Sequence, residues 1–119
     1  MRNVTDEQFI AALREVVAGN EDFVYTKVKP AGENDDVVSR CRYFDHNGKP
    51  SCLIGQALFK CGIIVPKAFE GAAAATVLRE LTNTSERVHV AASRAQTVQD
   101  AGSPWGVALN DFEIVLMNG

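Results

Sequence analysis

The sequence lacks long apolar runs and has no excess of positive charge. None of its hydrophobic stretches approaches the roughly 18 to 20 residues needed to span a bilayer, so we expect no membrane segment. Its formal net charge is −3 and its basic residues are scattered, which argues against a general basic surface for nucleic acid. The polar start, residues 1–5, has no signal-peptide pattern, and the cysteine count is odd at three. We therefore expect a reduced, cytoplasmic protein.

The short motifs that mark many metal proteins and nucleotide-binding proteins are also missing. There is no glycine-rich phosphate loop and no closely spaced cysteine pair. Cys41, His46, Cys52 and Cys61 are of the types that bind zinc, but Cys52 and Cys61 are nine residues apart on one predicted helix. At about 100° per residue, their side chains would point in opposite directions. We expect buried cysteines instead, and no metal or other cofactor.

A cysteine nucleophile is the remaining catalytic alternative. Cys52 near a helix start and His46 in the preceding turn could form a thiol–imidazole pair, because helix N-termini favour the thiolate. No oxyanion or orienting motif surrounds these two residues. His89, beside Val88 and Val90, is expected to be a surface or hydrogen-bonded structural residue. The sequence thus predicts a non-enzymatic protein, with a thiol- or metal-dependent enzyme as a third alternative.

The most definite structural pattern occupies residues 41–63. Residues 47–48, Asn-Gly, predict a tight turn because glycine accepts a positive φ. Pro50 predicts the first turn of a helix, and Gly62 followed by Ile63 predicts that this helix ends in a Schellman motif. We expect this unit to form the centre of the fold.

Capping signals and helical periodicity predict further helices on both sides of this unit. Thr5 and Gln8 form a capping box at the start of the first helix, and Asn83 and Glu86 are expected to form another. The remaining signals are Pro66 at a short helical turn, an alanine-rich helix from about residue 72, and Ser103 with Pro104 at the start of the last helix.

The predicted fold is mainly α: a single domain, residues 1–119, that forms a compact bundle of about five helices. Residues 23–28 and 37–43 alternate in part, and they are expected to form a small extended or β-hairpin segment. Residues 114–117 are compatible with either a helix end or a strand.

A helix that ends at Gly62 and is followed by a helical turn at Pro66 has the outline of a helix-turn-helix. A recognition helix needs polar or basic residues to read a major groove. This one would offer only Lys67 and residues 68–70, of which two are apolar and one is acidic. A small DNA-associated regulator is therefore an alternative, and it is not the favoured one.

One pattern resembles that of small uncharacterised proteins of actinobacteria and their phages. It reads Y-x4-G-x-P-x-C-x-I-G-x2-L, and it departs from the family pattern at Gln56 and Phe59, where a histidine and a small or polar residue are expected. The resemblance implies a cytoplasmic accessory or phage-encoded protein and assigns no functional residues. It rests on Tyr43, Gly48, Pro50, Cys52, Ile54, Gly55, Leu58 and Gly62, followed by Gln96, Gln99, Asp100, Gly102, Trp105, Gly106, Ala108 and Leu109.

Together these observations favour a small interaction protein, a phage-encoded or actinobacterial accessory factor that binds and modulates a host protein. The expected contact residues are Tyr43, His46 and Lys49 around the central turn, and Trp105 if its ring is exposed. The partner is expected to be a protein rather than a nucleic acid. A homo-oligomer stays open, because a helical face built for a core has the same pattern as one built for a dimer.

Overall fold

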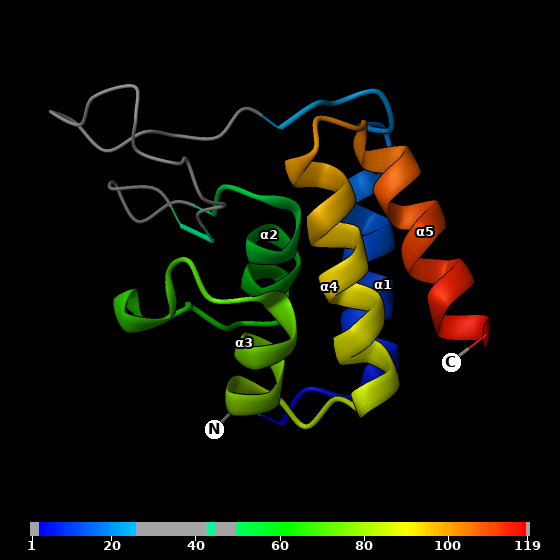
Figure 1. Ribbon diagram of the computed structural model, residues 1–119. Coiled ribbons are helices and arrows are strands. Elements are labelled where there is room, and N and C mark those ends of the chain that lie inside the picture. Colours follow the sequence, from blue (N-terminus) through cyan, green and yellow to red (C-terminus); the bar gives the residue numbers. More distant parts are fainter. Residues whose placement is uncertain (1–2, 26–42, 45–49, 119) are drawn as a thin grey trace, which may run out of the picture.

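The computed structural model describes residues 3–25, 43–44 and 50–118. It confirms the predicted mainly α bundle, with five α-helices and one short 3-10 helix in the described part of the chain (Figure 1). Residues 114–117 are helical. The helices are α1 (Asp6–Val17), α2 (Leu53–Lys60), η1 (Lys67–Phe69), α3 (Ala74–Leu81), α4 (Glu86–Asp100) and α5 (Trp105–Asn118).

The predicted hairpin of residues 23–28 and 37–43 lies almost wholly outside the described residues. Within them, β-type pairing is limited to two isolated bridges, Val24 with Pro104 and Phe44 with Pro50. Both bridges hold an extended segment against the start of a helix.

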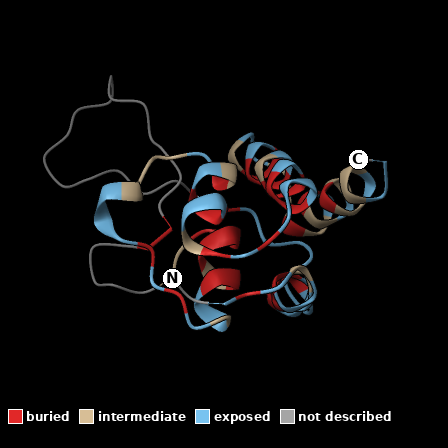
Figure 2. Cartoon of the chain, turned by 90° about the horizontal axis from the view of Figure 1, so that it is seen from below, coloured by how far each residue is buried: buried red, intermediate tan, exposed pale blue. Residues whose placement is uncertain are grey.

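Helix α4 lies in the middle of the bundle (Figure 1). It contacts α5 on one side and α2 and α3 on the other, while α1 packs behind it against α2 and α5. Three small residues of α4, Ala91, Ala92 and Ala95, are fully buried, and their size lets the neighbouring helices approach closely. The larger side chains of Phe9 and Phe112 are fully buried as well. Buried residues lie along the inward faces of the helices (Figure 2).

Two predicted helix ends are confirmed atom by atom. The Thr5 hydroxyl accepts from the Gln8 amide while the Gln8 side chain accepts from the Thr5 amide, which completes the capping box of α1. At the end of α2, the amide of Gly62 donates to the Phe59 carbonyl and that of Ile63 donates to the Leu58 carbonyl, both at 2.9 Å. With Gly62 at φ 84°, this is the Schellman ending that the sequence predicts.

Two predicted helix starts are wrong. Pro50 does not lie in the first turn of a helix, because α2 begins at Leu53 and Pro50 pairs with Phe44 in a bridge. Asn83 does not cap α4: the cap is Ser85, whose hydroxyl accepts from the Val88 amide. The Asn83 amide instead donates to the Asn3 side chain at 2.8 Å, so a contact across the fold replaces the local one.

The start of α5 is displaced by one residue from the predicted one, Pro104, for a similar reason. Its first helical residue is Trp105. The amides of Trp105 and Gly106 donate to the carbonyls of Phe23 and Glu21 at 2.8 and 2.9 Å. The segment after α1 therefore supplies the acceptors that a capping side chain would otherwise provide.

Candidate interaction surface

The structure corrects the predicted contact residues. Tyr43 and Trp105 are only 0% and 2% exposed, so neither ring is available to a partner on the folded chain. His46 and Lys49 lie outside the described residues. The Tyr43 hydroxyl donates to the Ala72 carbonyl and accepts from the Gln96 amide, which makes it a buried link between segments.

Two buried glutamines of α4 take the place of capping side chains for two other helices. The Gln99 amide oxygen accepts from the backbone amide of Leu53, the first residue of α2, at 2.8 Å. The Gln96 amide oxygen accepts from Ala74, the first residue of α3, at 2.9 Å. Neither α2 nor α3 has a side-chain hydrogen bond from its own N-cap residue. Gln99 also accepts from the Trp105 indole at 3.2 Å.

Several residues of the pattern given in the sequence analysis lie in the interior, although Gly62 and Gly102 are exposed. Tyr43, Gly55, Gln96, Gln99 and Trp105 connect α2, α3, α4 and α5 through the hydrogen bonds above and through the close approach of Gly55 to the Tyr43 backbone. These five residues therefore serve to hold the helices together, and they do not form a binding surface.

The accessible part of the central unit is the end of α2. Both carboxylate oxygens of Glu70 accept backbone amides, from Tyr43 at 2.8 Å and from Phe44 at 3.2 Å, which holds this segment in place. The Phe44 ring packs edge-on against Phe59, with 6.0 Å between centroids. Phe59 itself is 48% exposed, and Ile64 beyond the Schellman turn is 67% exposed. We call Phe59 and Ile64 the α2-end surface.

Sequence reasoning missed the α2-end surface although the signal was present. The apolar stripe predicted for this helix contains Leu53, Ile54, Ala57 and Leu58, all of which are buried. Phe59 falls outside that stripe. A large aromatic residue that lies off the core face of a short amphipathic helix is expected to be exposed, and this indicates a candidate contact surface.

The zinc and thiol alternatives depend in part on Cys41 and His46, which lie outside the described residues. Within the described residues, no group of three or more potential metal-ligating side chains occurs. Cys52 is fully buried before α2, and its suggested partner His46 is outside the described residues. Cys61, at the other end of the helix, is half-buried, and this burial raises the pKa of its thiol. A raised pKa lowers the thiolate fraction, which is the opposite of what a nucleophile requires.

Cys61 lines a depression of about 410 Å³ between α1 and the end of α2. The two charged side chains at its rim, Lys60 and Glu15, pair with each other at 3.4 Å. The Cys61 thiol donates to the Gln8 carbonyl at 3.8 Å. The depression therefore presents partnered groups rather than a group poised to react.

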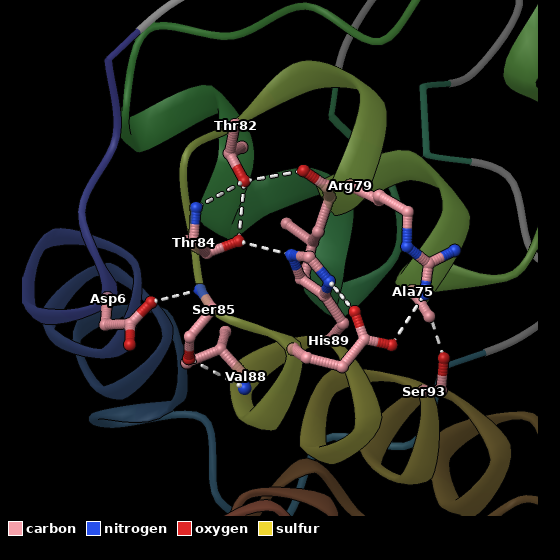
Figure 3. Close-up of polar contacts among 11 residues, drawn as sticks. Asp6, Ala75, Arg79, Thr82, Thr84, Ser85, Val88, His89 and Ser93 are labelled. Atoms are coloured by element: carbon pink, nitrogen blue, oxygen red, sulfur yellow. Dashed lines mark hydrogen bonds and ion pairs between the residues drawn. The ribbon is translucent and has the colours of Figure 1, made fainter.

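A polar network joins α3, α4 and the start of α1 (Figure 3). Buried His89 lies 3.1 Å from the Glu86 carboxylate through Nδ1 and 2.9 Å from the Thr84 hydroxyl through Nε2. Thr84 is itself buried and bonded to the Thr82 hydroxyl at 2.6 Å. Both ring nitrogens of His89 are thus occupied, as predicted for a structural histidine. The acid–histidine–hydroxyl order resembles a catalytic relay, but its hydroxyl faces protein.

Glu86 is the exposed end of this network, and it predicts an acid-sensitive contribution to stability. The hydrogen bond from Arg79, at 2.7 Å, and then that from His89 hold the pKa of the Glu86 carboxyl below its usual value of 4.5. A lowered folded-state pKa stabilises the fold at pH above 4.5, and this contribution is lost as the pH falls through the folded-state value.

We therefore expect Glu86→Gln to lower the urea midpoint near neutral pH and to have no such effect once the pH is well below 4.5. Urea unfolding followed by circular dichroism at the two pH values measures the difference. Glu80→Gln, which removes an α3 carboxylate with no ion pair among the described residues, is the control. An equal effect of Glu86→Gln at both pH values would contradict the prediction.

The helix-turn-helix outline has no α-helix at Pro66, where its second helix was predicted. Between α2 and α3 the chain forms only η1, a 3-10 helix of three residues, which is too short to lie along a major groove. Among the helices described, none is long and apolar enough to cross a bilayer. Comparisons of the chain with protein-family models, with curated proteins and with solved structures give no significant match.

Proposed function

We propose that this protein is a non-enzymatic interaction protein that binds and modulates a host protein. The observation that carries the proposal is the α2-end surface, where Phe59 and Ile64 expose large apolar side chains on either side of the Schellman turn. From the resemblance of the sequence pattern, we propose that it is a phage-encoded or actinobacterial accessory factor that acts in the cytoplasm.

The surroundings of Phe59 support a binding role for it. Its ring contacts Phe44, whose backbone amide is held by Glu70, so the ring has a fixed neighbour. An exposed aromatic ring with a fixed neighbour loses little conformational freedom on binding, which favours affinity. Aromatic residues are also enriched among the residues that dominate interface energies.

Phe59 is in addition a position at which this chain departs from the family pattern. Large pattern residues such as Tyr43 and Trp105 are in the interior, whereas Phe59 stands on the surface in place of a small or polar residue. A surface departure of this kind changes what the protein contacts without changing how it folds. We propose that Phe59 contributes to the choice of partner.

The proposal is tested by capture of partners from a nuclease-treated actinobacterial lysate, with mass spectrometry of what remains bound after a moderate salt wash. Wild-type protein is expected to retain one stoichiometric host protein. The double variant Phe59→Ser, Ile64→Ser should lose at least about 90% of it, because each side chain contributes on the order of 1–2 kcal/mol of apolar burial.

Met117→Ser is the matched control, because Met117 is an exposed apolar residue on a different helix. It should retain the partner, and circular dichroism should show that all three proteins are folded. Recovery of nothing above background, or equal recovery by the double variant, would contradict the proposal. A salt-dependent shift of duplex DNA by the wild type, without a protein partner, would favour the DNA-associated alternative.

A further inference from the structure

We infer that the outer face of the α4–α5 pair joins two copies of this chain about a twofold axis. This face lies on two antiparallel neighbours and is turned away from α1, which packs behind them (Figure 1). We call it the hairpin face, and it consists of Arg87, Val90, Arg94 and Thr97 on α4 and of Val107, Asp111 and Ile114 on α5.

The apolar content of α5 is the first argument. Its core side carries Trp105, Ala108 and Phe112, all buried. Val107 and Ile114 lie on another side of the same helix and are each 46% exposed. A helix with apolar residues around most of its circumference is normally covered on more than one side. Within the described residues, α4 and α1 cover the core side of α5, whereas Val107 and Ile114 remain exposed.

Helix α4 extends this apolar area. Val90 is 52% exposed, and it lines a shallow depression together with Val115 of α5. Arg87 borders the same depression and has no ion pair among the described residues. The face thus carries valines and an isoleucine on both sides of the charged Arg94–Asp111 pair.

The arrangement of charge selects a second copy as the occupant. Arg94 of α4 and Asp111 of α5 lie at the same level and face each other at 3.6 Å across the pair. Consider a twofold axis that runs parallel to the two helices and lies between the two copies. Rotation about this axis places α5 of the second copy over α4 of the first. Arg94 of each copy then faces Asp111 of the other. The four charges alternate in sign, so each gains a second partner of opposite charge.

The alternative face-to-face arrangement is unfavourable. An axis perpendicular to the helices lays α4 on α4, which brings the Arg87 and Arg94 rows of two copies together. Like charges placed opposite each other oppose association. The hairpin face is therefore self-complementary in one orientation only, and that orientation also lays Val90 over the α5 residues Ile114 and Val115.

The size of the face suits a weak dimer. Helices of 14 and 15 residues extend about 21 to 22 Å, and two of them are about 20 Å wide. Such a footprint is roughly 420 Å², about half of the roughly 800 Å² per partner that a standard interface buries. We expect a dissociation constant on the order of micromolar, with the dimer populated at high protein concentration.

The test is sedimentation equilibrium of the wild-type chain between about 1 and 200 μM, concentrations that bracket micromolar affinity. The average mass should rise from the monomer value of 12.9 kDa towards twice that value. Arg94→Asp and Asp111→Arg should each weaken association at least tenfold, because each places like charges across the interface. Circular dichroism melts establish that both variants are folded.

Mixing the two variants distinguishes an interface from a merely structural ion pair. An Arg94→Asp chain carries two acids at these positions and an Asp111→Arg chain carries two bases, so the mixture should form heterodimers with at least tenfold recovered affinity. Ile114→Asp should not associate with any of them.

A wild type that stays at 12.9 kDa throughout would overturn the inference. So would a dimer that all three variants form equally, or variants that fail to recover association on mixing. Suppose instead that the wild type is monomeric and captures a host protein, and that the Ile114→Asp variant does not capture it. A different protein then occupies this face. The result is independent of the α2-end surface, since Phe59→Ser, Ile64→Ser should leave the mass distribution unchanged.

Discussion

Gly55→Ala is expected to destabilise the protein by more than about 3 kcal/mol, which is a large part of the 5–15 kcal/mol typical of a small domain. A Cβ atom at this position would overlap the Tyr43 carbonyl, lying 2.7 Å from its carbon and 2.8 Å from the Tyr43 Cα. These are backbone atoms and cannot rotate away. The Tyr43 carbonyl also accepts from the Ser51 amide at 2.9 Å, so moving it would break a further contact.

The expected sign is the reverse of the usual one. In an unhindered helix, glycine to alanine stabilises by roughly 1 kcal/mol because alanine has the higher helix propensity. Gly106→Ala is the matched control: it is also a helical glycine, and its added Cβ would come no closer than 3.1 Å to Glu21. It should change stability by less than about 1 kcal/mol. Urea unfolding followed by circular dichroism measures both variants.

A Gly55→Ala protein as stable as the wild type would show that α2 does not pack on the Tyr43 backbone as described. The packing of the central unit would then have to be redrawn. Destabilisation by Gly106→Ala of the same size would point instead to a general sensitivity of these helices to substitution.

Gln99→Leu is expected to cost about 2–5 kcal/mol. Leucine is one bond shorter and apolar, so it cannot accept the hydrogen bonds from the Leu53 amide and the Trp105 indole. Each buried donor left without an acceptor costs roughly 1–3 kcal/mol. The Leu53 amide is affected most directly, because the N-cap residue of α2 offers no side-chain hydrogen bond in compensation.

Two further variants apportion this cost. Trp105→Phe removes one of the two donors, so its effect and that of Gln99→Leu should be less than additive in a double-mutant cycle, with a coupling of about 1 kcal/mol. Gln56→Leu is the control for the change of side chain, since this half-buried glutamine only donates to the Ser51 carbonyl. Additive effects in the cycle would contradict a shared acceptor at Gln99.

Tyr43 and Trp105, which the sequence suggested as contact residues, have structural roles because both are buried. Tyr43 and Trp105 are large amphipathic residues, and from the sequence such residues suit an interface as well as they suit a core. Their hydroxyl and indole groups find partners in Gln96 and Gln99, and this pairing depends on helices that are far apart in the chain. The same burial leaves Phe59 as the aromatic residue of α2 that faces outward.

The sequence by itself determined the features that depend on near neighbours. The capping box of Thr5 and Gln8, the Schellman ending at Gly62, and the buried alanines of α4 all involve residues within a few positions of one another. Local hydrogen bonds and the 3.6-residue period act over such short spans, so they can be recognised without knowledge of the fold.

The tertiary structure alone decided where α2, α3 and α5 begin and which aromatic residues are covered. The first amide of α2 is capped by a residue 46 positions away, and that of α3 by one 22 positions away. The first amide of α5 is capped by the carbonyl of Phe23. A buried amide needs an acceptor but does not specify where in the chain the acceptor comes from. Only the packing of α4 against its neighbours makes that choice.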